Sequence, residues 1–411
     1  MARVTPLRAL RPDPRVAPRV SSVPYDVVSV AEARALAAGE PLSFLRVTRS
    51  EIELPEDADP YAPEVYELAR TNLERLKREA PLATDPEPTL YVYRLTMGDH
   101  VQHGVAGAFS VEEYADGRIK KHEKTRRAKE DDRTRHIVTT RAQTGVVFLT
   151  YRARPAIDAT VARVTAGPPL YDFVAADGVG HTLWAATLAD RDALVDAFGE
   201  EPALYIADGH HRAASAWRAR EELRAGRAPH PPAPGAGDFE SFLAVAFPDD
   251  QVRVLPYHRV VLDLGGRAPA ELAAELAGRF GTIDDAPQPS APGRVSYYLE
   301  GRWRSFALPP APAGTSVASA LDCHRLQELV LEPLLDIGDL RTDPRIDFVG
   351  GIRGTAELER LVDSGRAAIA FAMHPVSAGD LFAVSDAGEI MPPKSTWFEP
   401  KLRDGLLIQE I

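Results

Sequence analysis

The chain has 411 residues, of which 45% are hydrophobic and 26% charged, and this composition excludes a disordered or collagen-like protein. Its length predicts two or three domains. Lys and Arg number 48 against 60 Asp and Glu, a net charge of -12 that argues against nucleic acid as a partner because phosphates would be repelled. Cys323 is the single cysteine, which excludes an intrachain disulfide and a cysteine-rich zinc site.

The same sequence argues against a membrane partner. No segment has the roughly 20 apolar residues needed to span a bilayer, and residues 1–24 are rich in Arg and Pro without the apolar run of a signal peptide. We therefore expect a cytoplasmic protein.

The first part of the chain, residues 1–113, is predicted to be an α/β segment. Helical patterns cover residues 29–38 and 59–79, and in the second helix Tyr66, Ala69, Leu73 and Leu76 form one apolar stripe. The hydrophobic run at residues 43–47 predicts a short strand. Residues 90–95 and 103–109 flank a turn and predict a hairpin.

Residues 114–227 are predicted to form a central core of alternating strands and helices. A charged run within residues 117–142 predicts a helix, strands are expected at 146–151, 183–187 and 203–207, and helices at 189–198 and after Arg212. A Pro/Gly/Ala-rich linker follows at residues 228–237. Residues 238–411, beginning with the apolar run 242–247, are predicted to form a separate α+β domain, so the fold class is α/β with a C-terminal α+β domain.

The sequence Asp208-Gly209-His210-His211-Arg212 lies where an apolar strand gives way to a helix. A helix start exposes unpaired N–H groups and the positive end of the helix dipole. Gly209 allows close backbone approach, and Arg212 can fork onto phosphate oxygens. The turn therefore predicts a phosphate site for a nucleotide.

Several roles are open for the other side chains of this turn. Asp208 can hold Mg²⁺ or cap the helix, and His210 and His211 can donate to phosphate or titrate near neutrality. The plainer alternative is that Asp208 is only a helix cap and the histidines lie on the surface. Zinc binding by two adjacent histidines is disfavoured because neighbours on a helix do not converge.

A second polar segment, His122-Glu123-Lys124-Thr125, precedes the charged run. Glu123 could accept the proton of an attacking hydroxyl, and Lys129 or Arg133 could offset charge on a transferring phosphoryl group. Taken alone, such a charged run is more often a solvated helix that keeps the surface soluble.

The HEKT segment followed by a DGHHR turn resembles the ParB-related fold of free L-serine kinases, in which an HE-type segment and a DGHHR-type turn share one site. A wider pattern resembles a bacterial and archaeal domain-of-unknown-function family, number ten-fifteen, over nearly the whole chain. It comprises PYDV at residues 24–27, SFLR at 43–46, HEKT at 122–125, IADGHHR at 206–212, PYHR at 256–259 and MPPKST at 391–396.

This resemblance implies a ParB-like nucleotide-binding core and the ATP- or ADP-dependent phosphorylation of L-serine to O-phosphoserine. Glu123 is then the base, Asp208 to Arg212 form the phosphate site, and Mg²⁺ dependence follows from the chemistry, with Asp208 as the first candidate ligand. The complete set of candidate residues is, for catalysis, Glu123, His122, His210 and His211, and, for the nucleotide, Asp208, Gly209, Arg212, Thr125, Lys129, Arg133 and Lys394.

Two related activities are alternatives. ParB proteins use a similar turn to bind CTP, so a nucleotide-binding switch or regulator without catalysis is the second hypothesis, although no DNA-binding region is recognisable here. Sulfiredoxin carries a cysteine in its turn where this chain has His210, which argues against its chemistry. In the tail, Lys394, Ser395 and Lys401 either contact phosphate or belong to a Pro-rich segment packed on a core.

Overall fold

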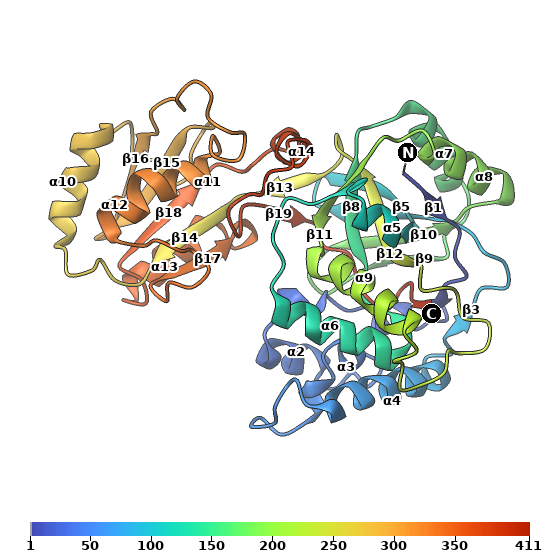
Figure 1. The fold of residues 1–411 in the computed structure, drawn as a ribbon. Coiled ribbons are helices and arrows are strands. Elements are labelled where there is room, and N and C mark those ends of the chain that lie inside the picture. Colours follow the sequence, from blue (N-terminus) through green and yellow to red (C-terminus); the bar gives the residue numbers. More distant parts are fainter. Residues whose placement is uncertain (1) are drawn as a thin grey trace. The chain divides into compact units, whose positions relative to one another are not determined.

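A computed structural model describes residues 2–411 and divides them into two compact units (Figure 1). The large unit contains the chain up to Lys120, Thr125–Val252 and Pro400–Ile411. The small unit contains Lys121–Lys124 and Arg253–Glu399. The chain therefore leaves the large unit twice and returns to it twice.

The large unit is built on a nine-stranded mixed sheet in the order β6-β11-β8-β12-β5-β4-β10-β9, with β1 paired to β5. The predicted hairpin is confirmed as β4 and β5, which pair from Tyr91 with Ala106 to Met97 with His100. The strands are β1 Val4–Thr5, β4 Tyr91–Met97, β5 His100–Ser110, β6 Ile119–Lys120, β8 Val147–Tyr151, β9 Tyr171–Val174, β10 Gly180–Ala185, β11 Leu204–Asp208 and β12 Ser241–Pro248.

Helices pack on this sheet and on one another, and α6 packs against both α9 and α4 (Figure 1). The charged run does form the predicted helix, α6, and seven of its residues, all from Asp132 onward, are buried. The helices are α1 Ala17–Val20, α2 Val30–Ala37, α3 Leu45–Thr48, α4 Pro63–Glu79, α5 Val111–Ala115, α6 Arg127–Thr140, α7 Pro155–Thr165, α8 Leu188–Phe198 and α9 His210–Arg224, with 3₁₀ turns η1 Tyr25–Val27 and η2 Ser50–Glu53.

Two local predictions in the N-terminal part need correction. Residues 43–47 do not form a strand, because Leu45–Thr48 is the one-turn helix α3. A short buried apolar run has no periodicity that separates the two structures. The second helix begins at Pro63 rather than at residue 59, with proline in the first turn where its missing N–H costs nothing.

The domain boundaries differ from the predicted ones at residues 113/114 and 238. Strand β12 is a central strand of the large sheet, parallel to β8 and antiparallel to β5, and therefore belongs to the large unit. Its uninterrupted apolar sequence suits a strand buried on both faces. Segments 1–113 and 114–227 share this one sheet, and the small unit resumes only at Arg253.

The small unit has an antiparallel five-stranded sheet in the order β16-β15-β18-β14-β17, in agreement with the predicted α+β class. A separate two-stranded antiparallel ribbon pairs β13 with β19, which are the first and last strands of the segment Arg253–Glu399. The elements are β13 Arg253–Leu255, β14 Tyr257–Val261, α10 Pro269–Phe280, β15 Arg294–Leu299, β16 Arg302–Ala307, α11 Asp322–Leu326, α12 Glu332–Leu335, β17 Ile346–Gly350, α13 Gly354–Asp363, β18 Ile369–Met373, α14 Ala378–Asp386 and β19 Trp397–Glu399.

The last twelve residues return to the large unit and tie its N-terminal part together. β20 Gln409–Glu410 pairs with β7 Ala142–Gln143, and β2 Leu10–Arg11 pairs with β3 Ala83–Thr84. Bridges join Leu10 to Ile408 and Ser22 to Asp404. Among residues 2–411, no helix combines the length and apolar character needed to cross a bilayer.

The tail depends on a glycine that approaches an aromatic ring. Gly405 has φ +88° and a Cβ there would lie 2.7 Å from Phe44 Cγ. We expect Gly405→Ala to lower the free energy of unfolding by about 3 kcal/mol, through the unfavourable φ and the steric clash together. The control Gly39→Ala, at φ +74° with nothing within 4 Å, isolates the backbone contribution and should cost about 1 kcal/mol. Urea unfolding checks both values, and equal losses would contradict the packing role.

Candidate functional site

Strand β11 passes into helix α9 through Gly209, which has φ 95° and ψ 30°. Gly209 is the N-cap of α9 and has no side chain that could cap the helix. Asp208 ends the strand instead, so the plainer alternative of Asp208 as a helix cap is wrong. A Cβ at position 209 would lie 3.2 Å from the Arg212 guanidinium carbon. Both the positive φ and this close approach favour glycine.

Arg212 turns back under the turn rather than outward. Its side chain is 5% exposed, and its Nη2 donates to both carboxylate oxygens of Asp26 at 3.1 Å. Nη1 donates to the carbonyl oxygen of Val146, while Nε has no hydrogen-bond partner among residues 2–411. Most of the guanidinium therefore binds the protein itself. Removing one partner of such a buried pair typically costs about 3–5 kcal/mol, so Arg212 has a structural role as well as the predicted phosphate role.

Asp208 lies between two cations. Its Oδ2 is 3.0 Å from Lys401 Nζ, and its Oδ1 is 3.6 Å from Arg212 Nη2. Although burial opposes ionisation, Lys401 and Arg212 hold the pKa of Asp208 well below its usual value. A carboxylate whose two oxygens face cations does not fit Mg²⁺, so the expectation of Asp208 as the metal ligand is not supported. Nor do the described residues contain a cluster of three or more metal-binding side chains.

The two histidines of the turn have different surroundings. His210 is buried, whereas His211 is only partly buried. His211 Nε2 accepts the backbone N–H of Arg126 at 3.0 Å. Burial lowers the pKa of His211, so its ring is neutral at pH 7 with the proton on Nδ1. The bond to Arg126 joins the helix start to the residue after the HEKT segment.

The HEKT segment itself is divided between the two units. His122, Glu123 and Lys124 cluster with the small unit, and Thr125 with the large one. Within the small unit, His122 Nε2 lies 3.2 Å from Thr396 Oγ1, and its carbonyl accepts the N–H of Met391 at 2.8 Å. HEKT and MPPKST, far apart in sequence, are thus paired.

Three other predicted nucleotide-binding residues have contacts within their own units. Lys394 belongs to the small unit, where its Nζ lies 5.4 Å from the Tyr257 ring centroid. Lys129 Nζ lies 3.2 Å from the Tyr61 hydroxyl. Thr125 donates to a carboxylate oxygen of Glu130 through its hydroxyl.

Arg133, by contrast, is brought to the turn. It pairs with Asp132 at 3.0 Å and stacks 4.3 Å from the Tyr25 ring centroid. Arg133, Tyr25 and Arg212 line one small cavity of about 20 Å³, which is large enough for a single water molecule. The structure therefore places two of the predicted arginines around one buried space.

Sequence reasoning assigned no role to Asp26 and Asp404. Asp26 lies in the PYDV segment, which belongs to the wider family pattern but has no chemical role assigned to it there. Asp404 is fully buried, its Oδ1 accepts the N–H of Val146 at 3.2 Å, and its Oδ2 has no partner among the described residues. No local signal marks Asp404, because its neighbours come from distant parts of the chain.

Asp404 predicts a pH dependence of stability. Burial raises its pKa to about 7, and Arg212 only partly offsets this. Between about pH 4 and pH 7 the native state holds a proton that the unfolded state has released, so stability falls as pH rises through this range. We expect Asp404→Asn to remove this fall, up to about 4 kcal/mol. Urea unfolding at pH 5 and pH 8 measures it.

The exposed control Asp57→Asn should leave the pH dependence unchanged. An Asp404→Asn variant whose stability falls between pH 5 and pH 8 as steeply as that of the parent protein would show that another group is responsible.

Comparisons with known proteins complete the description of this site. No curated protein matches the chain. Among solved structures, a free serine kinase in complex with AMP shares 13% identity over 74% of this chain and 91% of that chain, with a TM-score of 0.35. SbnI with C-terminal truncation from Staphylococcus aureus shares 13% identity, over 74% and 87% respectively, with a TM-score of 0.36.

A conserved hypothetical protein from Pyrococcus furiosus also shares 13% identity, over 74% of this chain and 95% of that chain, with a TM-score of 0.35. The family described as "Protein of unknown function (DUF1015)" matches residues 4–324, which span the turn, the HEKT segment and all of the large sheet. The chain therefore belongs to the DUF1015 family.

Proposed function

We propose that this protein is a nucleotide-dependent phosphotransferase that transfers a phosphoryl group from ATP or ADP to the hydroxyl of a small molecule. L-Serine is the acceptor implied by the resemblance of the HEKT and DGHHR segments to free L-serine kinases. The observation that carries the proposal is the start of α9, where the N-cap is the glycine Gly209 and the buried Arg212 lies against it.

The turn offers several groups to a phosphate. The N-cap of α9 is a glycine, so no N-cap side chain competes for the first N–H groups of the helix, and such groups bind phosphate oxygens well. Arg212 has an unpaired Nε, and His211 carries its proton on Nδ1, so both retain a donor. Lys401, held against Asp208, adds positive charge beside the helix start.

The acceptor requires a base, and Glu123 is the residue that we assign to it. The hydroxyl oxygen forms a bond to phosphorus while the bond from phosphorus to the nucleotide's bridging oxygen breaks, and the hydroxyl proton passes to the Glu123 carboxylate. Glu123 is partly exposed and lies two residues before Thr125 in the chain. The hydrogen bond from the Arg126 N–H to His211 holds Arg126, the residue after Thr125, at the start of α9.

A substitution that keeps the shape of the side chain tests this assignment. We expect Glu123→Gln to reduce O-phosphoserine formation by at least about 100-fold, because the amide cannot accept the proton. Nucleotide affinity should change less than about twofold. Mass spectrometry of the product, with L-serine, Mg²⁺ and either ATP or ADP, measures turnover, and calorimetry measures binding.

The exposed carboxylate Glu64 on α4 provides the control, and Glu64→Gln should keep full turnover. Unchanged turnover in Glu123→Gln would remove Glu123 from the mechanism. A parent protein that binds nucleotide but forms no phosphoserine would instead support a nucleotide-binding switch without catalysis.

A further inference from the structure

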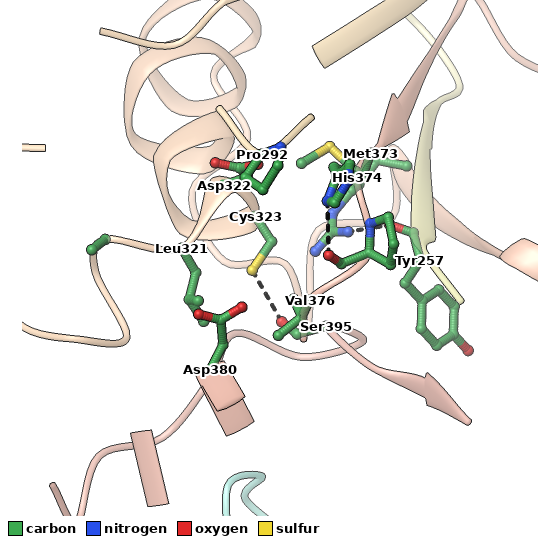
Figure 2. A pocket seen from close by; sticks show the side chains of 13 residues that line it. Tyr257, Pro292, Leu321, Asp322, Cys323, Met373, His374, Val376, Asp380 and Ser395 are labelled. Carbon is green, nitrogen blue, oxygen red and sulfur yellow. Dashed lines mark hydrogen bonds between the residues drawn. The ribbon is translucent and has the colours of Figure 1, made fainter. Parts of the chain in front are cut away.

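The small unit contains a cavity of about 110 Å³ that the proposed phosphotransfer does not use. It lies where β14 and β18 approach the start of α11, and Figure 2 shows its lining from these elements. The polar residues that line it include Arg259, Asp322, Cys323, His374, Asp380 and Ser395. Every one of these residues belongs to the small unit.

Arg259 is the exceptional residue in this lining. It is only 1% exposed, and its Nη1 donates to the carbonyl oxygen of Tyr257. Nε and Nη2 donate to no oxygen or nitrogen, and no carboxylate among residues 2–411 pairs with this guanidinium. The guanidinium interacts with the thiol of Cys323, and its Cζ lies 5.5 Å from the ring centroid of Phe348.

A buried charge without an anionic partner is costly, and burial accordingly lowers the pKa of Arg259. Three other buried arginines, Arg212, Arg220 and Arg403, are each paired with a carboxylate. The two unpaired nitrogens of Arg259, Nε and Nη2, form the edge of a guanidinium whose parallel N–H groups match the two oxygens of a carboxylate. The unsatisfied edge therefore has the geometry of an oxyanion receptor.

The rest of the lining selects the charge of the ligand. Asp322 and Asp380 both line the cavity, and each has a structural partner. Asp322 accepts the N–H of Gly293 at 2.8 Å. Asp380 accepts the N–H of Ser377, the N-cap of α14, in a capping box. One arginine against two carboxylates disfavours a doubly charged phosphate. A single negative charge beside a donor or ammonium group fits better, and at about 110 Å³ the cavity suits only a small molecule.

We propose that this cavity binds a small molecule with one carboxylate group, held by the Nε and Nη2 edge of Arg259. The thiol of Cys323 and the hydroxyl of Ser395, which are 3.2 Å apart (Figure 2), form its polar wall beside Arg259. All residues of this site lie in the small unit.

Calorimetry and thermal unfolding of the full chain test the proposal, with glycine, acetate and inorganic phosphate as probes. Glycine has no hydroxyl that could accept phosphate, so its binding does not depend on the proposed transfer. We expect glycine or acetate to bind and to raise the Tm with concentration. Arg259→Met should weaken this binding at least tenfold. It should also raise the Tm of the ligand-free protein, because it removes an unpaired buried charge.

A matched control is Arg325→Met. Arg325 is also buried in the small unit and also donates to a carbonyl, that of Pro309, but unlike Arg259 it has no buried nitrogen that lacks a partner among the described residues. This variant should lower the Tm and keep the affinity for glycine or acetate. The proposal is overturned if neither carboxylate binds, or if phosphate alone binds. It is equally overturned if Arg259→Met lowers the Tm of the ligand-free protein, because the guanidinium would then already have its partner within the chain.

Discussion

The guanidinium of Arg212 is the interaction on which the large unit depends. It donates to the carboxylate of Asp26 in the N-terminal segment and to the carbonyl oxygen of Val146, the residue before β8. It also lies 3.6 Å from the carboxylate of Asp208 at the end of β11. A buried arginine is stable only when such partners surround it. Three separate parts of the chain are therefore held against the first turn of α9.

The same arrangement suits a helix start whose N-cap is a glycine. An N-cap side chain would occupy the N–H groups that an anion needs. Here the carboxylate of Asp208, which precedes the N-cap, is held by Lys401, and the tail that supplies Lys401 also supplies the buried Asp404. The charge beneath the turn is thus balanced within the protein.

Local patterns were sufficient to predict the elements around the turn, because β11 is a continuous apolar strand and the helix after it shows a clear buried face. They failed at residues 43–47, where three apolar residues suit a helical turn as well as a strand. They also failed at β12, because the Pro-rich segment before it looks like a domain linker although the strand adds to the large sheet. The roles of Asp26 and Asp404 arise only from contacts between distant segments, so no window of sequence could reveal them.

The HEKT segment reads as one motif in the sequence, yet it is divided between the two units. His122 contacts Thr396 in the small unit, while Arg126, the residue after HEKT, donates to His211 in the large unit.

The central claim is that the start of α9 holds the phosphates of a nucleotide, and amide chemical shifts test it most directly. In a titration of the isotope-labelled protein with ADP, the account predicts that the backbone amides of His210, His211 and Arg212 shift most, because their N–H groups would bind phosphate oxygens. Saturable binding of ADP that leaves these three amides unmoved while others shift would contradict it.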